Sequence, residues 1–407
     1  ITTNWISSVD GVTPLTLLAN PYPNGLLQKP RTQAELLLLG QNLDINDRAS
    51  KNNIYSQQWN FGIQRQLPGN VVIEVAYAAS KGTRLPAGII FNQLDPVYQA
   101  LGAQLNTQVP NPFFGLVPTG TLSTATVARG QLLRPYPQYG TMSTLNPART
   151  QNIGSSIYHS GTLRAEKRFS HGINLVVSYA KAKLIDDSSG RIFGENGNPP
   201  PVQNNYNLRG ERSISEGDVA QRLVINHTID LPFGHGKKLM SGAPRALDLL
   251  VGGWSASGTA SFATGFPVWM QSTGNSGVFS SRLRPNNTGK SAKLEGGVQS
   301  RLTRYFDTSQ FTVPAPFTFG NVSRTLPDVR APGRRNYDLA LSKNFRVREP
   351  VSVLFRAETF NITNTPYFGG VNTAGSNPGN NLGTPTFGVI TDSTGERQVQ
   401  FSLKIIW

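Results

Sequence analysis

Six charged residues at alternating positions are the part of this sequence that could do chemistry. Each occupies the polar phase of a segment in which apolar and polar residues alternate: Glu74, Arg164, Glu166, Arg168, Arg356 and Glu358. If these segments are strands, all six side chains point to the face opposite the apolar residues. They could form a charged lining that docks another part of the protein or guides a solute. Cross-strand ion pairs that only stabilise the sheet are the simpler interpretation, and we favour it.

The other reactive residue types form no catalytic or metal-binding pattern. The four histidines lie far apart and lack metal-ligand spacing: His159, His171, His227 and His235. No Gly-x-Ser-x-Gly motif lies between a strand and a helix, which argues against a serine nucleophile. Asp44 with Asp47, or Asp186 with Asp187, could bind calcium in a loop, but neither pair matches the EF-hand calcium loop. We therefore expect no enzymatic activity, no metal site and no cofactor.

The composition favours β-structure with many turns. Gly (41) and Pro (28) are abundant, whereas charged residues make up only 15% and hydrophobic residues 38% of the 407 residues. That is too little charge for a typical disordered chain. The absence of Cys excludes disulfides and thiolate metal sites. The net charge of +15 comes from Lys and Arg residues scattered through the chain, so we expect no nucleic-acid partner.

Alternation with a period of two residues predicts a series of antiparallel hairpins. Trp59, Phe61 and Ile63 lead into the turn at 67–70, and an alternating segment follows it at 71–78. Similar pairs lie at 162–169 with 173–180, 223–231 with 254–262, and 337–345 with 351–355, and a last strand covers 398–407. We expect nine or ten strands, with two more between 278 and 319. The first fifty residues show no strand pattern, and 33–39 could be a short helix or a loop.

The lengths of the connections indicate a barrel in a membrane. No stretch approaches the roughly 18 apolar residues of a transmembrane helix, so a membrane role requires a closed barrel. Short turns alternate with long polar stretches at 85–153, 186–217 and 369–388. Short periplasmic turns and long extracellular loops are typical of outer-membrane barrels. We therefore predict an all-β, antiparallel transmembrane barrel whose lipid-facing side chains include Phe61, Ile63, Val75, Val177, Leu341, Val353 and Leu403.

Four stretches resemble a known family. Residues 57–70 with Glu74-Val-Ala-Tyr77 and Ser80-Lys-Gly-Thr83, and residues 163–172, are similar to barrel segments of TonB-dependent receptors. So are Asp230-Leu-Pro-Phe-Gly234 with Gly252-Gly-Trp254, and 333–364, which holds Phe355-Arg-Ala-Glu358. The resemblance is to the subgroup with a carboxypeptidase-regulatory-like domain ahead of the plug. It spans residues 55 to 407, interrupted by loops that match nothing.

The resemblance implies a barrel of 22 strands in the bacterial outer membrane, filled by a plug and driven through the periplasmic TonB complex. It implies uptake of a scarce solute, such as a metal chelate, a glycan or a peptide. We expect 1–53 to be a loop-rich entry segment and 54–407 to be the carboxy-terminal portion of the barrel. The plug, the TonB box and the regulatory-like domain are then expected outside this chain. A passive porin-like channel of ten to twelve strands and a surface or secreted β-rich structural protein are the alternatives.

The last strand has a second expected role. Val399, Phe401, Leu403, Ile405 and Trp407 place five apolar side chains on one face, with an aromatic ring at the end. A lipid-facing strand with an interfacial ring explains this pattern. The resemblance further implies that such a strand is the signal read by the barrel-assembly machinery, by pairing along its edge. A plain closing strand is the alternative.

Overall fold

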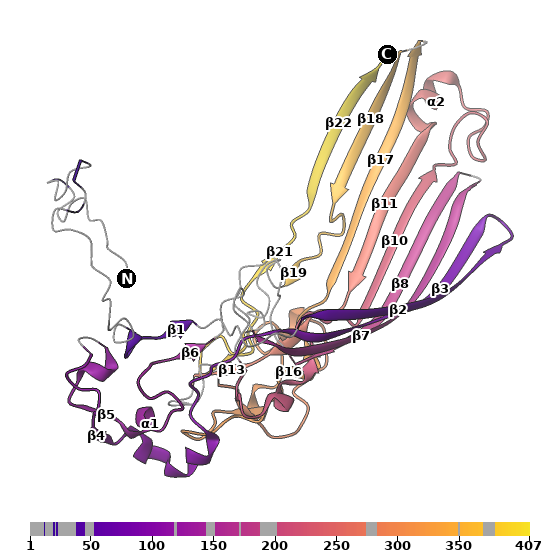
Figure 1. The fold of residues 1–407 in the computed structure, drawn as a ribbon. Coiled ribbons are helices and arrows are strands. Elements are labelled where there is room, and N and C mark those ends of the chain that lie inside the picture. Colours follow the sequence, from indigo (N-terminus) through magenta and orange to yellow (C-terminus); the bar gives the residue numbers. More distant parts are fainter. Residues whose placement is uncertain are drawn as a thin grey trace.

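The wall of the molecule is one antiparallel sheet. The computed structural model describes residues 12, 19–20, 22, 38–44, 53–117, 120–143, 151–170, 172–187, 202–273, 283–348, 351–368 and 379–407. Nine long strands follow one another in chain order: β2 (Tyr55–Leu67), β3 (Val71–Ala87), β7 (Gln151–Ser170), β8 (Ile173–Asp186), β10 (Gln221–Asp230), β11 (Trp254–Ala263), β17 (Arg334–Arg348), β18 (Val351–Phe360) and β22 (Gln398–Ile406). Figure 1 shows them side by side. The predicted antiparallel β-architecture is confirmed.

The sheet is open, because its first and last strands do not meet. β2 and β22 stand at opposite ends of the strand order, and the only addition to the path is β9 (Ser213–Ile214), which pairs with β8. A sheet edge presents unpaired backbone N–H and C=O groups. In lipid such groups need partners. The described strands therefore form part of a barrel wall.

Strand register gives the sheet one apolar and one polar face. From β2 to β11 the paired residues Ile63, Val75, Leu163, Tyr179, Leu223 and Phe262 form one row. One residue along each strand, the row reads Gln64, Glu74, Arg164, Ser178, Val224 and Ser261. Paired residues share a face and successive residues alternate. We call the first the outward face and the second the polar face; all seven side chains predicted to meet lipid lie on the outward face.

Short and long connections gather at opposite ends of the sheet (Figure 1). β2 and β3, β7 and β8, and β17 and β18 are joined by turns of two or three residues. The long connections, at 88–150, 187–220, 264–333 and 361–397, collect at the other end, and we call their described residues the loop cap. The reversal between β10 and β11 is the exception among the turns, because it spans 231–253 and contains α2 (Arg245–Val251).

The loop cap is built from short elements. Its strands are β4 (Gln108–Pro110), β5 (Thr126–Ala128), β6 (Met142–Ser143), β12 (Pro267–Trp269), β13 (Gln271–Ser272), β14 (Asn286–Asn287), β15 (Phe311–Thr312), β16 (Thr325–Arg330), β19 (Tyr367–Phe368), β20 (Asn381–Leu382) and β21 (Ser393–Thr394); β1 (Leu43–Asp44) pairs with β6. Its helices are α1 (Arg129–Leu132) and the 3-10 turns Pro96–Asn106, Thr121–Ser123, Leu208–Glu211, Gln299–Arg301 and Thr308–Gln310. No helix in the described part of the chain is long and apolar enough to cross a membrane.

The buried hydrophobic clusters of the described residues lie in the loop cap. One cluster surrounds Phe306 and Met270, a second joins Leu94 and Leu105 to Phe317, and a third holds Leu122. The second cluster connects the 88–150 segment to the 264–333 segment, so separate connections fold together. A buried ion pair between Glu211 and Arg284 likewise joins two of them.

One expectation about the chain needs correction, and another concerns residues outside the described ranges. The two extra strands expected between 278 and 319 are not wall strands. β14 and β15 are two residues long and pair only with each other, inside the loop cap. Side chains there pack into a compact core, which favours irregular backbone over a long alternating strand. Residues 33–37 and most of the first fifty lie outside the described ranges.

Candidate lumen surface and carboxy-terminal strand

The polar face carries two separate groups of the charged residues selected from the sequence. On β7, Arg164 Nη2 lies 2.9 Å from Glu166 Oε2, and Arg168 Nε lies 3.7 Å from Glu166 Oε1. Glu74 on β3 stands opposite Arg164 in register. Residues two apart on one strand share a face, which is why Arg164, Glu166 and Arg168 can form these ion pairs.

The second group lies on β18. Arg356 Nη2 and Glu358 Oε1 are 2.6 Å apart, and both side chains remain partly exposed. The strands β8, β10, β11 and β17 separate this pair from the group on β7, so the structure does not bring the six residues together. In the described part of the chain, their ion pairs run along strands. The expected cross-strand ladder is not formed by these residues.

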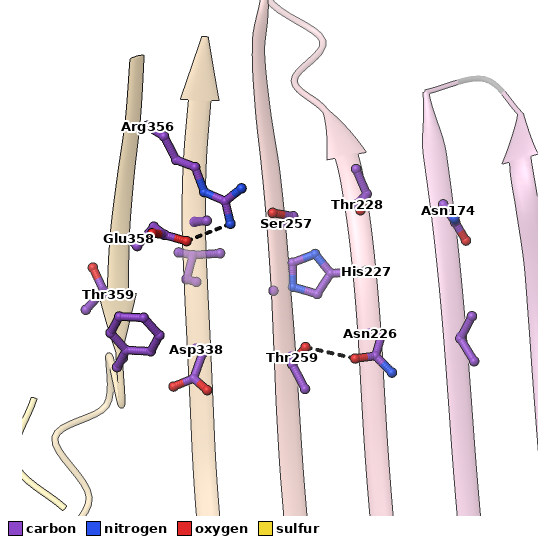
Figure 2. Close-up of a pocket in the computed structure, with 15 residues that line it drawn as sticks. Asn174, Asn226, His227, Thr228, Ser257, Thr259, Asp338, Arg356, Glu358 and Thr359 are labelled. Carbon is purple, nitrogen blue, oxygen red and sulfur yellow. Dashed lines mark hydrogen bonds and ion pairs between the residues drawn. The ribbon is translucent and has the colours of Figure 1, made fainter. Parts of the chain in front are cut away.

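A hollow of about 360 Å³ on the polar face surrounds the second group. Figure 2 shows Arg356 and Glu358 beside polar side chains from β8, β10, β11 and β17: Asn174, Asn226, Thr259 and Asp338. Thr259 Oγ1 donates a hydrogen bond of 2.8 Å to Asn226 Oδ1. Asp338 accepts hydrogen bonds from the Asn361 backbone N–H (2.8 Å) and from Asn336 Nδ2 (2.9 Å).

Three of these neighbours are uncharged and were missed because only charged residues were selected from the sequence; Asp338 is charged and was also not selected. Asn174, Asn226, Thr259 and Asp338 occupy the same polar phase as Arg356, and that phase was the available signal. Together these residues give the hollow a guanidinium group, carboxylates, amides and a hydroxyl on an open surface. Such groups can exchange hydrogen bonds with a passing polar solute or with another protein surface.

The last strand presents its apolar side chains on the outward face. Val399, Phe401, Leu403 and Ile405 are paired in register with outward residues of β18. The Phe401 ring stacks on Phe355 with centroids 6.4 Å apart. Trp407 follows the end of the strand and is exposed. Because β22 has β18 as its single partner in the sheet, its other edge is free to pair.

Several of the remaining candidates from the sequence make structural contacts. Among the described residues, no group of three or more potential ligands could hold a metal ion. His159 Nδ1 lies 2.6 Å from the Tyr77 hydroxyl, and Asp187 accepts a hydrogen bond of 2.6 Å from Ser155 Oγ. Asp186 forms an ion pair with Arg324. His171 and Asp47 lie outside the described residues.

Comparison with known proteins agrees with this architecture. The family model described as an outer membrane beta barrel domain matches residues 1–400. No curated protein matches the chain. Among solved structures, the outer membrane transporter YddB from Escherichia coli is 11% identical, with a TM-score of 0.42, over 90% of this chain and 34% of that chain. FpvAI, in a complex with pyocin S2, is 10% identical, with a TM-score of 0.32, over 86% of this chain and 26% of that chain.

The two structural similarities are too weak to carry a functional argument. This chain also spans only about a third of the YddB chain. The family match covers nearly the whole sequence and agrees with the alternating faces and the unequal connections. The predicted fold class and location are therefore confirmed. The chain belongs to the outer membrane beta barrel domain family and forms part of a barrel wall in the bacterial outer membrane.

Proposed function

We propose that this chain is the carboxy-terminal part of the barrel of a TonB-dependent transporter. The transporter takes up a scarce solute, such as a metal chelate, a glycan or a peptide. The observation that carries the proposal is an open wall with a hydrogen-bonding polar face, whose end strands β2 and β22 do not pair. The resemblance of 55–407 to TonB-dependent receptors implies that the TonB complex provides the energy for uptake.

Closing such a wall requires more strands. Each unpaired backbone group in lipid costs several kcal/mol, so the free edges of β2 and β22 need neighbours. A barrel of about 22 strands is wide enough to need a plug. In this proposal the plug docks on the polar face, against the groups around Glu166 and Arg356, and contacts the TonB complex in the periplasm. The chain itself carries out no enzymatic reaction and needs no cofactor.

A passive porin is the second candidate, and the strand order argues against it. A porin of ten to twelve strands closes on itself, which would pair its first strand with its last. In the described sheet β2 pairs with β3 and β22 pairs with β18, each on one side only. A secreted structural protein is disfavoured by the outward face, where Phe61, Phe401 and Leu403 are mostly exposed and need an apolar surrounding.

Uptake in cells that lack TonB separates the two channel proposals. The intact protein should move its solute only while TonB and the proton-motive force are present. Deleting the gene for TonB should then abolish uptake without changing the amount of barrel in the outer membrane. Uptake that continues unchanged would support the porin. Candidate solutes can be presented as pooled metal chelates, glycans and peptides.

The polar face can be tested separately. Replacing Arg356 and Glu358 together by Ala should change the rate of uptake, because both side chains line the hollow. Ala357→Val is the matched control, since Ala357 lies on the outward face of the same strand, opposite Phe401, and does not line the hollow. Equal uptake by all three proteins would remove the hollow from the transport route.

A further inference from the structure

The reversal between β10 and β11 is built differently from the turns beside it. Residues 231–253 contain the helix α2, whereas the neighbouring reversals have two or three residues. In Figure 1 α2 lies beside the turn end of the sheet, opposite the loop cap. In outer-membrane barrels this end, with the short turns, is the periplasmic one.

Two hydrogen bonds fix the end of α2 on the outward face of the wall. Trp254 Nε1 donates to the Leu250 carbonyl oxygen (2.8 Å), and Lys343 Nζ donates to the Leu249 carbonyl oxygen (2.6 Å). Trp254 and Lys343 are paired in register, and their row continues through Phe355 to Leu403. The helix therefore lies over β11 and β17 on the side that meets lipid.

A buried lysine, Lys343, lies beneath the end of α2. It is a lysine in an apolar row, yet its side chain is only 4% exposed. Its Nζ lies 5.0 Å from the Phe345 ring centroid and 5.7 Å from that of Trp254. Carbonyl oxygens at the end of a helix are suitable partners for an ammonium group. The end of α2 therefore covers a charge that would otherwise face acyl chains.

The outer surface of the same segment is apolar and uncovered. Leu250 is 70% exposed, and five more large apolar side chains are also exposed: Phe233, Leu239, Met240, Leu247 and Leu249. An open hollow of about 450 Å³ beside them is lined only by apolar residues, including Phe233 and Leu341. Because Leu341 also belongs to the outward face, the hollow is continuous with the lipid-facing surface of the wall.

We propose that residues 231–253 form an interfacial anchor that binds phospholipids of the periplasmic leaflet. The exposed leucines and the apolar hollow take acyl chains. Lys237, Lys238 and Arg245, in the same segment, are exposed and can pair with headgroup phosphates. Basic and apolar residues on one short amphipathic element are typical of segments that lie in the membrane interface. The proposal rests on the outer-membrane family and is independent of transport.

Spin labels on single cysteines test the anchor, because the chain has no Cys of its own. The intact protein, freed of cysteines elsewhere, is reconstituted in vesicles of phosphatidylethanolamine and phosphatidylglycerol. Collisions with oxygen, which concentrates in lipid, are compared with collisions with a water-soluble nickel chelate. Leu250→Cys should favour oxygen severalfold, as Phe401→Cys should on the wall. Glu295→Cys is the control, since its side chain in the loop cap is 88% exposed and lies outside the proposed anchor, and it should favour the nickel chelate.

Two results would overturn the proposal. A label at position 250 that favours the nickel chelate would place the helix in water. A label shielded from both reagents would mean that protein covers it, either another domain or a second copy. The headgroup contribution has its own readout, since replacing phosphatidylglycerol by phosphatidylcholine should reduce the oxygen preference at position 250. An unchanged preference would contradict binding through Lys237, Lys238 and Arg245.

Discussion

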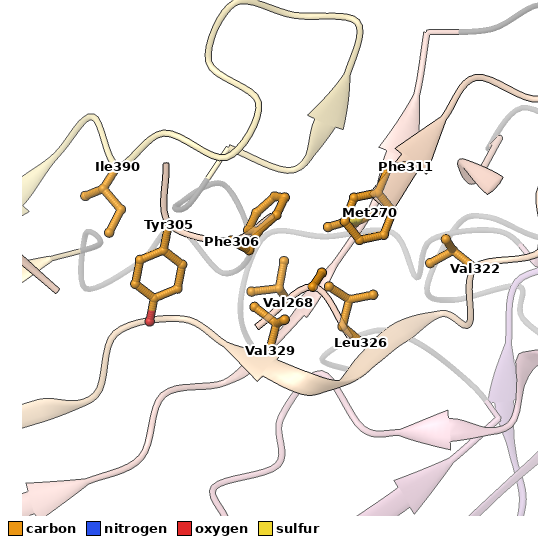
Figure 3. Close-up of a cluster of buried hydrophobic side chains, with 10 residues drawn as sticks. Val268, Met270, Tyr305, Phe306, Phe311, Val322, Leu326, Val329 and Ile390 are labelled. Carbon is orange, nitrogen blue, oxygen red and sulfur yellow. The ribbon is translucent and has the colours of Figure 1, made fainter. Parts of the chain in front are cut away.

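The wall and the loop cap place the same types of side chain in opposite surroundings. On the wall, Leu403 is 68% and Phe401 70% exposed. In the loop cap, Phe306 is 0% exposed and packs edge-on against Phe311 and Phe387, with ring centroids 5.9 and 5.3 Å apart. Figure 3 shows Phe306 and Phe311 among the other buried residues around them. Apolar groups avoid water in both regions; lipid surrounds the wall, and water surrounds the cap.

Charged groups show the same contrast between buried cap and exposed wall. The cap buries Glu211 against Arg284, with both side chains no more than 5% exposed. The wall leaves Arg356 and Glu358 partly exposed on the polar face. The cap is therefore stabilised like a soluble domain, by a packed core and buried ion pairs. The wall depends on its backbone hydrogen bonds and on lipid.

Deleting Trp407 should have the largest effect in cells and a small one in detergent. If the strand from Val399 to Trp407 is the assembly signal, the deletion abolishes folded protein in the outer membrane. A barrel refolded in detergent should barely change, because Trp407 lies beyond the end of β22. Membrane fractionation and refolding yield measure the two effects. Normal insertion of the truncated protein would leave only a plain closing strand.

Phe306→Ala should destabilise the loop cap by about 3–5 kcal/mol, because the ring is fully buried. Phe114→Ala is the matched control, since Phe114 is exposed in the same cap. Hydrogen exchange should show that cap amides lose protection while amides of β10 and β11 keep it. Equal loss in the wall would show that the two regions unfold together.

Leu403→Arg should cost the wall about 2–4 kcal/mol, because it places a charge among acyl chains. Gln400→Arg should be tolerated, since position 400 lies on the polar face opposite Glu358. Urea unfolding of both variants in lipid vesicles measures the difference. Similar losses at the two positions would refute the assignment of the faces.

Arg356→Ala should have the smallest effect, less than about 1 kcal/mol, because a partly exposed ion pair contributes little to stability. The same unfolding measurement applies, with Arg168→Ala as a comparison on β7. A loss of more than about 2 kcal/mol in the free energy of unfolding would mean that the ion pair contributes more to the stability of the wall than its exposure indicates.

Sequence alone predicted the wall well, because a strand with lipid on one face has a period of two residues. The hairpins around 67–70 and 171–172 and the phase of Phe61, Val75 and Leu403 follow from that pattern. The loop cap was not predicted, since Leu94, Leu105 and Phe306 pack from irregular segments that show no period. The helix α2 is too short for a reliable helical pattern.

The polar face was predicted only in part. Alternation was enough to place Arg356 and Glu358 on one side of β18. It could not show that Asn226, Thr259 and Asp338 surround them, because that neighbourhood depends on the register across four strands. Register is set by pairing between distant segments, which a single sequence does not display.

Quenching by lipids along β22 tests the two faces of the wall most directly. A fluorophore is attached to single cysteines at positions 400 to 405 of the intact protein, in vesicles whose lipids carry brominated acyl chains. Quenching should be strong at 401, 403 and 405 and weak at 400, 402 and 404, because only the first set faces lipid. Equal quenching at all six positions, or the reverse alternation, would contradict a barrel wall with its polar face turned to the lumen.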